Sequence, residues 1–132
     1  MSNNKITIVI NTFKSEDKIH NCLKSIDNNF KVIVVENSKN MNFKSELENK
    51  YSNVECVLAG ENLGYAKGNN LGLKNVSTKF ALIINPDAKL EKNAISNFFI
   101  SAKNKPNFSI ISPMIQEGQN ENDLIKSENN LI

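Results

Sequence analysis

The stretch Phe80-Ala-Leu-Ile-Ile-Asn-Pro-Asp-Ala88 decides the expected fold, because it joins an apolar strand to a polar turn. Five consecutive apolar residues, Phe80 to Ile84, predict a strand buried on both faces, as in a parallel sheet. Pro86 lacks a backbone donor and ends the strand, so Asp87 follows directly after its carboxyl end. Ligands bind at this edge of open α/β sheets. Two interpretations remain open here: a carboxylate ligand for a hard divalent cation, or a plain turn that leads into a helix.

Length and charge exclude several classes of protein. A chain of 132 residues with 39% apolar residues predicts one domain with a modest core. The formal net charge of +2 is spread along the chain, without the basic stripe of a nucleic-acid-binding protein, so we expect no nucleic-acid partner. All 16 basic residues are lysines, so a bound phosphate would need Lys, backbone N–H groups, a helix end or a metal ion.

Cysteine and histidine give no sign of a redox, zinc or nucleophile site. Cys22 and Cys56 stand among apolar neighbours, which favours two buried thiols over a disulfide or a metal site. His20 falls off the apolar stripe of its expected helix, and we expect a solvated residue rather than a catalytic one. No signal peptide and no apolar run of about 20 residues are found, and a cytoplasmic location is the expectation.

Strand and helix patterns alternate along the chain. Short β-branched and apolar runs predict about five strands, at residues 5–11, 31–35, 53–59, 80–84 and 108–112. Helices are expected after a cap at Ser15, over residues 42–51, from the glycine-rich turn to about Asn75, and along an apolar stripe at residues 95–102. This order predicts a mostly parallel sheet with helices on both faces. We expect a folded domain over residues 1–115 and a polar tail over residues 116–132.

In a parallel sheet, the polar residues that follow each strand meet at one edge. The expected edge carries residues 11–13, 36–38, 60–62 and 85–87. Neither a dinucleotide-binding fingerprint nor a P-loop is present there. Glu36 could accept hydrogen bonds from a ribose or a base, or it could be a solvated loop acid. The sequence on its own favours neither.

Glycine recurs every four residues at Gly60, Gly64, Gly68 and Gly72. On a helix, this spacing predicts one smooth face that lies close to the sheet. Close packing accounts for Gly68 and Gly72. Gly64, near the expected helix start, could let backbone N–H groups contact a diphosphate.

Five segments, taken in order, resemble a known family. I-T-I-V-I-N-T-F, V-I-V-V-E-N-S, E-N-L-G-Y-A-K-G-N-N-L-G-L, F-A-L-I-I-N-P-D-A and F-S-I-I-S-P-M-I are similar to successive motifs of family 2 glycosyltransferases. The third segment resembles the rhamnosyltransferase-like branch. The resemblance covers roughly residues 5 to 115. It implies the GT-A nucleotide-sugar-binding fold, cut off at its C-terminal side.

The resemblance also implies a role for several residues. Thr12 and Glu36 would hold the nucleoside of a UDP- or dTDP-sugar, with Glu36 where the family usually has Asp. The donor pocket beside the ribose and diphosphate would be shaped by Asn62, Gly64 and Asn70.

Metal binding is likewise implied by the resemblance. Asp87, with Asn85 two positions earlier, resembles the family's metal-binding acidic motif. Mg²⁺ or Mn²⁺ at Asp87 would bridge the diphosphate and stabilise charge on the departing nucleoside diphosphate.

In this family the general base and most of the acceptor site follow the region that is matched here. The resemblance therefore implies an inverting transferase in polysaccharide or glycoconjugate synthesis whose base is absent from this chain. A glycan or lipid-linked acceptor, a homodimer or a missing C-terminal partner segment, and a peripheral position at the inner face of the membrane are further expectations. Two alternatives stay open: a truncated, non-catalytic nucleotide-binding or interaction module, and a generic flavodoxin-like module in which Asp87 has no role.

Overall fold

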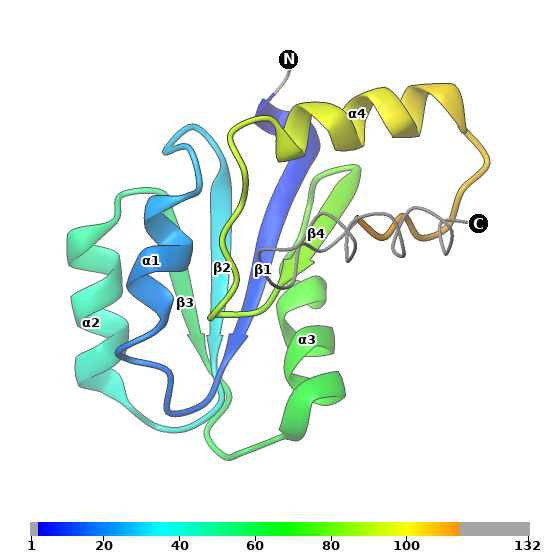
Figure 1. Cartoon of the computed structure of the whole chain (residues 1–132). Coiled ribbons are helices and arrows are strands. Elements are labelled where there is room, and N and C mark those ends of the chain that lie inside the picture. Colours follow the sequence, from blue (N-terminus) through cyan, green and yellow to red (C-terminus); the bar gives the residue numbers. More distant parts are fainter. Residues whose placement is uncertain (1–2, 114–132) are drawn as a thin grey trace, which may run out of the picture. The chain divides into compact units, whose positions relative to one another are not determined.

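Four parallel strands form the core of the described chain. The structure is a computed structural model that describes residues 3–113. A short 3₁₀ turn, η1 (Asn3–Lys5), leads into the sheet, whose strands are β1 (Ile6–Thr12), β2 (Lys31–Glu36), β3 (Val54–Leu58) and β4 (Phe80–Ile84). Their order is β3-β2-β1-β4, and every pairing is parallel (Figure 1). The predicted α/β fold with a parallel sheet is thus confirmed, with four strands among the described residues instead of about five.

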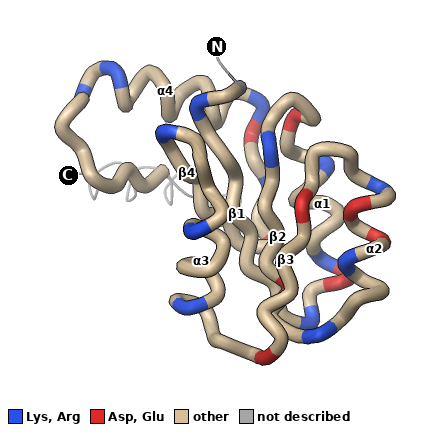
Figure 2. The backbone as a smooth tube through the Cα atoms, turned by 180° about the vertical axis from the view of Figure 1, so that it is seen from behind, with Lys and Arg blue, Asp and Glu red and all other residues tan. Residues whose placement is uncertain are grey.

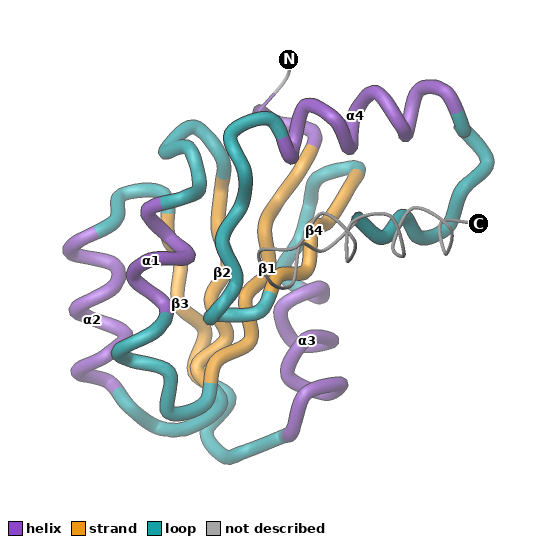
Figure 3. The backbone as a smooth tube through the Cα atoms, viewed as in Figure 1, coloured by secondary structure: helices purple, strands orange, loops and turns teal. Residues whose placement is uncertain are grey.

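Helices cover both faces of this sheet. Figure 3 shows α1 (Ile19–Lys24) and α2 (Met41–Lys50) on one side of the strands and α3 (Gly64–Lys74) on the other. Side chains alternate between the faces along a strand, so Val9 and Val35 point to α3 while their neighbours point to α1 and α2. The helices join consecutive parallel strands, as the alternating sequence pattern predicts.

The buried centre of the sheet is β1 and β2. The three residues Ile8, Val9 and Ile10 are fully buried, as is the run of residues 32–35 in β2. β4 lies at the edge and pairs with β1 alone among the described residues, and Ile83 is 42% exposed. The prediction that residues 80–84 are buried on both faces is therefore wrong. An apolar run marks a strand, but it does not distinguish a central strand from an edge strand.

The second compact unit of the chain, Asn93–Ile132, contains α4 (Ala94–Asn104) in its described part. This helix confirms the apolar stripe at residues 95–102, but the fifth strand predicted at residues 108–112 is not formed. Pro106 and Pro113 bracket that short run and remove backbone donors on both sides, and Ile110 is 88% exposed. The polar tail expected over residues 116–132 lies outside the described residues.

Two glycines let α3 approach the sheet closely. A Cβ atom on Gly72 would lie 2.5 Å from Val9 Cγ1, and one on Gly68 would lie 2.5 Å from Asn11 Oδ1. Close packing of these two glycines is therefore confirmed. Gly60 and Gly64 instead have φ angles of +82° and +78°, so they shape the turn before the helix, and the four glycines do not share one helical face.

The start of α1 also differs from the prediction. Ser15 does not cap this helix, which begins at Ile19; its hydroxyl donates to the Phe13 carbonyl (3.1 Å). The carbonyl of Ser15 instead accepts the N–H groups of Lys18 and Ile19 at 3.0 and 3.1 Å, which closes a turn. Residues 15–18 therefore form a turn that precedes the helix.

His20 is not the solvated residue expected. Its side chain is 21% exposed, with Nδ1 2.8 Å from Tyr51 Oη and Nε2 3.3 Å from Glu46. The ring stacks on Tyr51 and so ties α1 to the end of α2. Both cysteines are free and buried, as predicted. None of the helices in residues 3–113 has the length and apolar character needed to cross a membrane.

Candidate functional site

The carboxyl ends of the strands meet at one edge, as the parallel pairing predicts (Figure 1). Backbone hydrogen bonds continue past the strands into the first loop residues. The N–H of Asn37 donates to the Thr12 carbonyl (2.8 Å), and the N–H of Gly60 donates to the Ser38 carbonyl (3.0 Å). This edge, called the rim below, consists of residues 11–13, 36–38, 60–64 and 85–88. The ladder that builds the sheet thus also holds the first residues of the loops after β2 and β3.

Glu36 is a buried carboxylate at the end of β2. The residue is 1% exposed, so the interpretation as a solvated loop acid is wrong. Thr12 Oγ1 lies 2.9 Å from Oε2 of Glu36, and Ser38 Oγ lies 2.7 Å from Oε1; both hydroxyls can donate to the carboxylate. The same Thr12 hydroxyl lies 3.0 Å from the Val35 carbonyl. Glu36 therefore joins the end of β1 to the loop after β2.

The charge of Glu36 reaches a buried thiol on the neighbouring strand. Burial raises the pKa of Cys56 to about 11; Lys44 opposes this rise, while the carboxylates of Glu36 and Glu48 add to it. The thiol therefore stays protonated at neutral pH, whereas a nucleophile or a metal ligand needs the thiolate. Burial therefore disfavours the thiolate form of Cys56.

Asn37 fixes the loop that leads into α3. It is 2% exposed; its Oδ1 accepts the N–H of Leu63 (2.8 Å), and its Nδ2 donates to the Gly64 carbonyl (3.0 Å). The exposed Asn62 accepts the N–H of Gly64 through Oδ1 (3.0 Å). Among the backbone N–H groups near the helix start that could contact a diphosphate, that of Gly64 is therefore already engaged by Asn62.

A second, half-buried amide supports the first turn of α3. Asn11 Nδ2 donates to the carbonyls of Gly64 (3.4 Å) and Tyr65 (3.2 Å). The amide lies against Gly68, and its Oδ1 is buried with no hydrogen-bond partner among the described residues. Sequence reasoning placed Asn11 and Asn37 on the rim without assigning either a role. Asparagine is so frequent in this chain that two more of them carried no signal.

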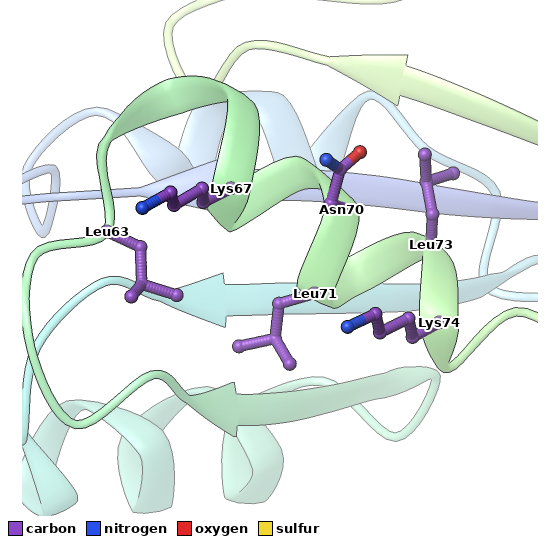
Figure 4. A pocket seen from close by; sticks show the side chains of 6 residues that line it. All are labelled: Leu63, Lys67, Asn70, Leu71, Leu73 and Lys74. Carbon is purple, nitrogen blue, oxygen red and sulfur yellow. The ribbon is translucent and has the colours of Figure 1, made fainter.

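The hydrogen bonds of Thr12 and Glu36 do not involve Asn70. Asn70 is exposed on α3, the helix that covers the face of the sheet away from α1 and α2. It lines a surface cavity of about 600 Å³ with Leu63, Lys67, Leu71, Leu73 and Lys74. Figure 4 shows these side chains leaving α3 on different sides, so the feature is an open surface rather than an enclosed pocket. Figure 2 shows lysines and no acid on α3, which favours an anionic ligand beside this helix.

Asp87 and Asn85 are exposed in a tight turn after β4. The N–H of Ala88 donates to the Asn85 carbonyl (3.1 Å), so a turn is formed as expected, although the next helix begins only at Ala94 and Asp87 does not cap it. The Asp87 carboxylate is exposed at the rim. The thiol of Cys22 lies nearby: its pKa is raised to about 11, first by burial and then by the charge of Asp87.

The donors around Asp87 fit one particular kind of metal binding. In residues 3–113, no three Asp, Glu, His or Cys side chains gather at one point, so a complete protein cage for a metal ion is absent from this part of the chain. Mg²⁺ in particular is commonly held by one or two carboxylates together with water and substrate phosphates. The single Asp87 carboxylate therefore fits an ion that arrives with a diphosphate.

Comparisons with known proteins agree on one family. The sequence model described as Glycosyl transferase family 2 matches residues 7–130. The chain is 31% identical over 116 residues to the low-salt glycan biosynthesis hexosyltransferase Agl10 of Haloferax volcanii, covering 83% of this chain and 36% of that protein. It is 26% identical over 119 residues to a teichoic acid poly(glycerol phosphate) polymerase of Staphylococcus epidermidis, covering 84% of this chain and 16% of that protein.

Solved structures show the same fold. The crystal structure of S. aureus TarS 1–349 matches with a TM-score of 0.64 at 19% identity, over 86% of this chain and 40% of that one. The structure of the same protein in complex with UDP matches equally well, with a TM-score of 0.64. The chain therefore spans less than half the length of each of these similar proteins.

Proposed function

Because the chain belongs to glycosyltransferase family 2, we propose that it binds a nucleoside-diphosphate sugar at the rim and supplies the donor-binding part of a glycosyl transfer reaction. The support is the similarity to a named hexosyltransferase and to a protein solved with UDP. The acceptor is proposed to be a glycan or a lipid-linked precursor. The chain spans 36% of the Haloferax relative, so complete sugar transfer is also a proposal for this protein.

One observation carries the proposal: the exposed Asp87 carboxylate directly follows β4, next to the ends of β1 and β2, which internal hydrogen bonds hold in place. Asp87 is exposed, while Glu36 and Asn37 are buried and use their polar atoms within the protein. Of the two exposed acids of the rim, Asp87 and Glu61, Asp87 follows the strand that pairs with β1, and it suits a ligand that brings its own cation and its own hydrogen-bonding groups.

The nucleoside is proposed to lie over the ends of β1 and β2. Thr12 and Glu36 are each 1% exposed, so their proposed role is to fix the surface that the base and ribose contact. A direct hydrogen bond from the nucleoside to the Glu36 carboxylate would require the Ser38 hydroxyl to move aside. The diphosphate is proposed to lie between Asn62 and Asp87, above the turn that Gly64 begins. A role for Asn70 requires the sugar to extend along α3.

Transfer is proposed to be an inverting displacement. An acceptor hydroxyl attacks the anomeric carbon, the bond from that carbon to the diphosphate oxygen breaks, and the nucleoside diphosphate departs with the bonding electrons. A Mg²⁺ or Mn²⁺ ion held by Asp87, with Asn85 beside it, would supply positive charge to the departing diphosphate. The base that takes the acceptor's proton is proposed to come from a segment beyond residue 113.

Calorimetric titration with UDP and dTDP, each with Mn²⁺ or with EDTA, tests this proposal. We expect binding in Mn²⁺ to weaken at least about tenfold in Asp87→Ala, to the level that the wild type shows in EDTA. Glu91→Ala is the matched control, because Glu91 is another exposed acid of the same unit. The proposal fails if the wild type binds neither nucleotide, or if Glu91→Ala and Asp87→Ala behave alike.

A further inference from the structure

Two hydrogen bonds join α1 to the segment that carries Asp87. The thiol of Cys22 donates to the Asn85 carbonyl, with Sγ and O 3.7 Å apart, across 63 residues of sequence. The hydroxyl of Ser25, the C-cap residue of α1, accepts the N–H of Leu90 at 3.0 Å, across 65 residues. Asp87 lies between these two points of attachment, so both sides of its turn are held by one short helix.

The geometry at each point leaves little freedom. Ser25 Oγ donates its only hydrogen to the Cys22 carbonyl (2.6 Å), so the lone pairs of this oxygen are what remain for the Leu90 N–H. Cys22 is fully buried, so water cannot replace its thiol as the donor to Asn85. The Asn85 carbonyl also accepts the Ala88 N–H, which closes the turn around Asp87.

Little else in the described chain holds this segment. Residues 85–92 contain no helix or strand. Apart from its own turn bond, this segment forms its hydrogen bonds within residues 3–113 with Cys22 and Ser25. A carboxylate on such a segment would otherwise lose conformational freedom when it binds a cation, and prior fixation removes that cost.

We propose that Cys22 and Ser25 are positioning residues that hold the Asp87 carboxylate in place for a cation bound together with a diphosphate. The inference rests on the proposed function and deepens it, because it assigns a role to two side chains that touch neither metal nor nucleotide. Together the pair is called the α1 clamp below. It acts on the cation-dependent part of binding, since it fixes the acid and leaves the ends of β1 and β2 unchanged.

The first test needs no ligand. Amide hydrogen exchange of Leu90 and Ala88 is measured in wild type, Ser25→Ala and Ser25→Thr, with Ser52→Ala as an exposed serine control. We expect faster exchange at Leu90 in Ser25→Ala and protection restored in Ser25→Thr, which keeps the accepting oxygen. Unchanged exchange at Leu90 in Ser25→Ala would overturn the clamp.

The second test separates positioning from general destabilisation. The ratio of UDP affinities in Mn²⁺ and in EDTA is measured for Ser25→Ala and Cys22→Ala, with Cys56→Ala as the control. Cys56 is also a buried free thiol but lies on β3. We expect the ratio to fall about two- to tenfold in the clamp variants, the range for one neutral hydrogen bond, with affinity in EDTA and the ratio in Cys56→Ala unchanged.

The outcomes distinguish the clamp from the proposed function. If Asp87→Ala removes the Mn²⁺ effect while Ser25→Ala and Cys22→Ala keep the wild-type ratio, the clamp is refuted and the proposed function stands. If the wild type binds no nucleotide, the proposed function fails, and a positioning role toward a bound cation fails with it, whatever the exchange of Leu90 shows.

Discussion

Glu36 offers the sharpest test of the structural reasoning, because one conservative replacement should leave stability nearly unchanged while another should lower it. Glu36→Gln keeps the length of the side chain. The Thr12 hydroxyl can then donate to the Val35 carbonyl, 3.0 Å away, and accept from the new amide, while Ser38 still donates to the amide oxygen. Glu36→Asp keeps the charge but shortens the side chain by one methylene, about 1.5 Å.

The magnitudes follow from these contacts. In Glu36→Gln, two hydrogen bonds to a charged group become neutral ones, which costs about 1 kcal/mol each, and the burial of a charge is relieved, which offsets most of that. We expect a net change within about 1 kcal/mol. In Glu36→Asp the carboxylate can no longer reach both hydroxyls at 2.9 and 2.7 Å. Losing one charged hydrogen bond and one buried methylene costs about 2.5–4 kcal/mol in total.

Urea unfolding followed by circular dichroism measures these differences. Glu55→Asp is the control, since Glu55 is an exposed acid whose side chain is 50% accessible and pairs with Lys31; we expect a change within about 0.5 kcal/mol. The reasoning is refuted if Glu36→Asp is as stable as the wild type, or if Glu36→Gln is the more destabilised of the two. Either result would mean that the buried carboxylate is not held through both hydroxyls.

Three further predictions concern packing and titration. Gly72→Ala should lower the free energy of unfolding in urea by about 1–2 kcal/mol, because the new Cβ would lie 2.5 Å from Val9 Cγ1 and this overlap outweighs the gain in helix propensity. Lys67→Ala, at an exposed position of the same helix, is the control. A Gly72→Ala variant that is more stable than Lys67→Ala would contradict the close packing. The pKa of Glu48 is lowered, first by the hydrogen bond from Lys44, so its contribution is present above its ordinary value of 4.5 and is lost as the pH falls. The stability difference between wild type and Glu48→Gln should therefore shrink in urea titrations below pH 4.5, and a difference independent of pH would exclude the ion pair. Burial raises the pKa of Cys56 from 9.0 to about 11, so the stability that the neutral thiol contributes is lost as the pH rises through that range. In unfolding experiments at alkaline pH, the free energy of unfolding should therefore fall less steeply with pH in Cys56→Ala than in the wild type. Equal slopes in the two proteins would count against burial as the cause.

The sequence predicts the fold well wherever local pattern decides it. The β-branched runs of β1 and β2 and the polar residues after each strand were enough for a parallel sheet with one polar edge. Local pattern does not show where a strand lies within the sheet. Residues 80–84 form the most continuous apolar run of the motif region, yet they form the edge strand, because strand order depends on partners that are distant in sequence. The short run at residues 108–112 shows the opposite error, since apolar content alone does not make a strand between two prolines.

At the site, the sequence indicated exposed residues better than supporting ones. Asp87 and Asn62 were assigned from their place after a strand or in a motif, and both are exposed on the rim. Asn37 and Ser25 were not assigned, because a buried amide that bonds two backbone groups and a hydroxyl that accepts a distant N–H leave no periodic signal. Their importance depends on contacts across 26 residues or more, which a reading of local patterns does not see.

The residues that support the loops of the rim all come from the N-terminal part of the chain. The loop that begins α3 is held by Asn11 and Asn37, the end of β1 is held through Glu36, and the turn of Asp87 is held from α1. All of these supporting residues lie in the first 37 positions, whereas the residues proposed to face the diphosphate and its cation lie after residue 60. Early strands and α1 are the most buried part of the unit, so they hold the later loops with little freedom of their own. Substitutions in the early segment should therefore alter ligand binding without touching the ligand, and their effects should divide by the loop each one supports.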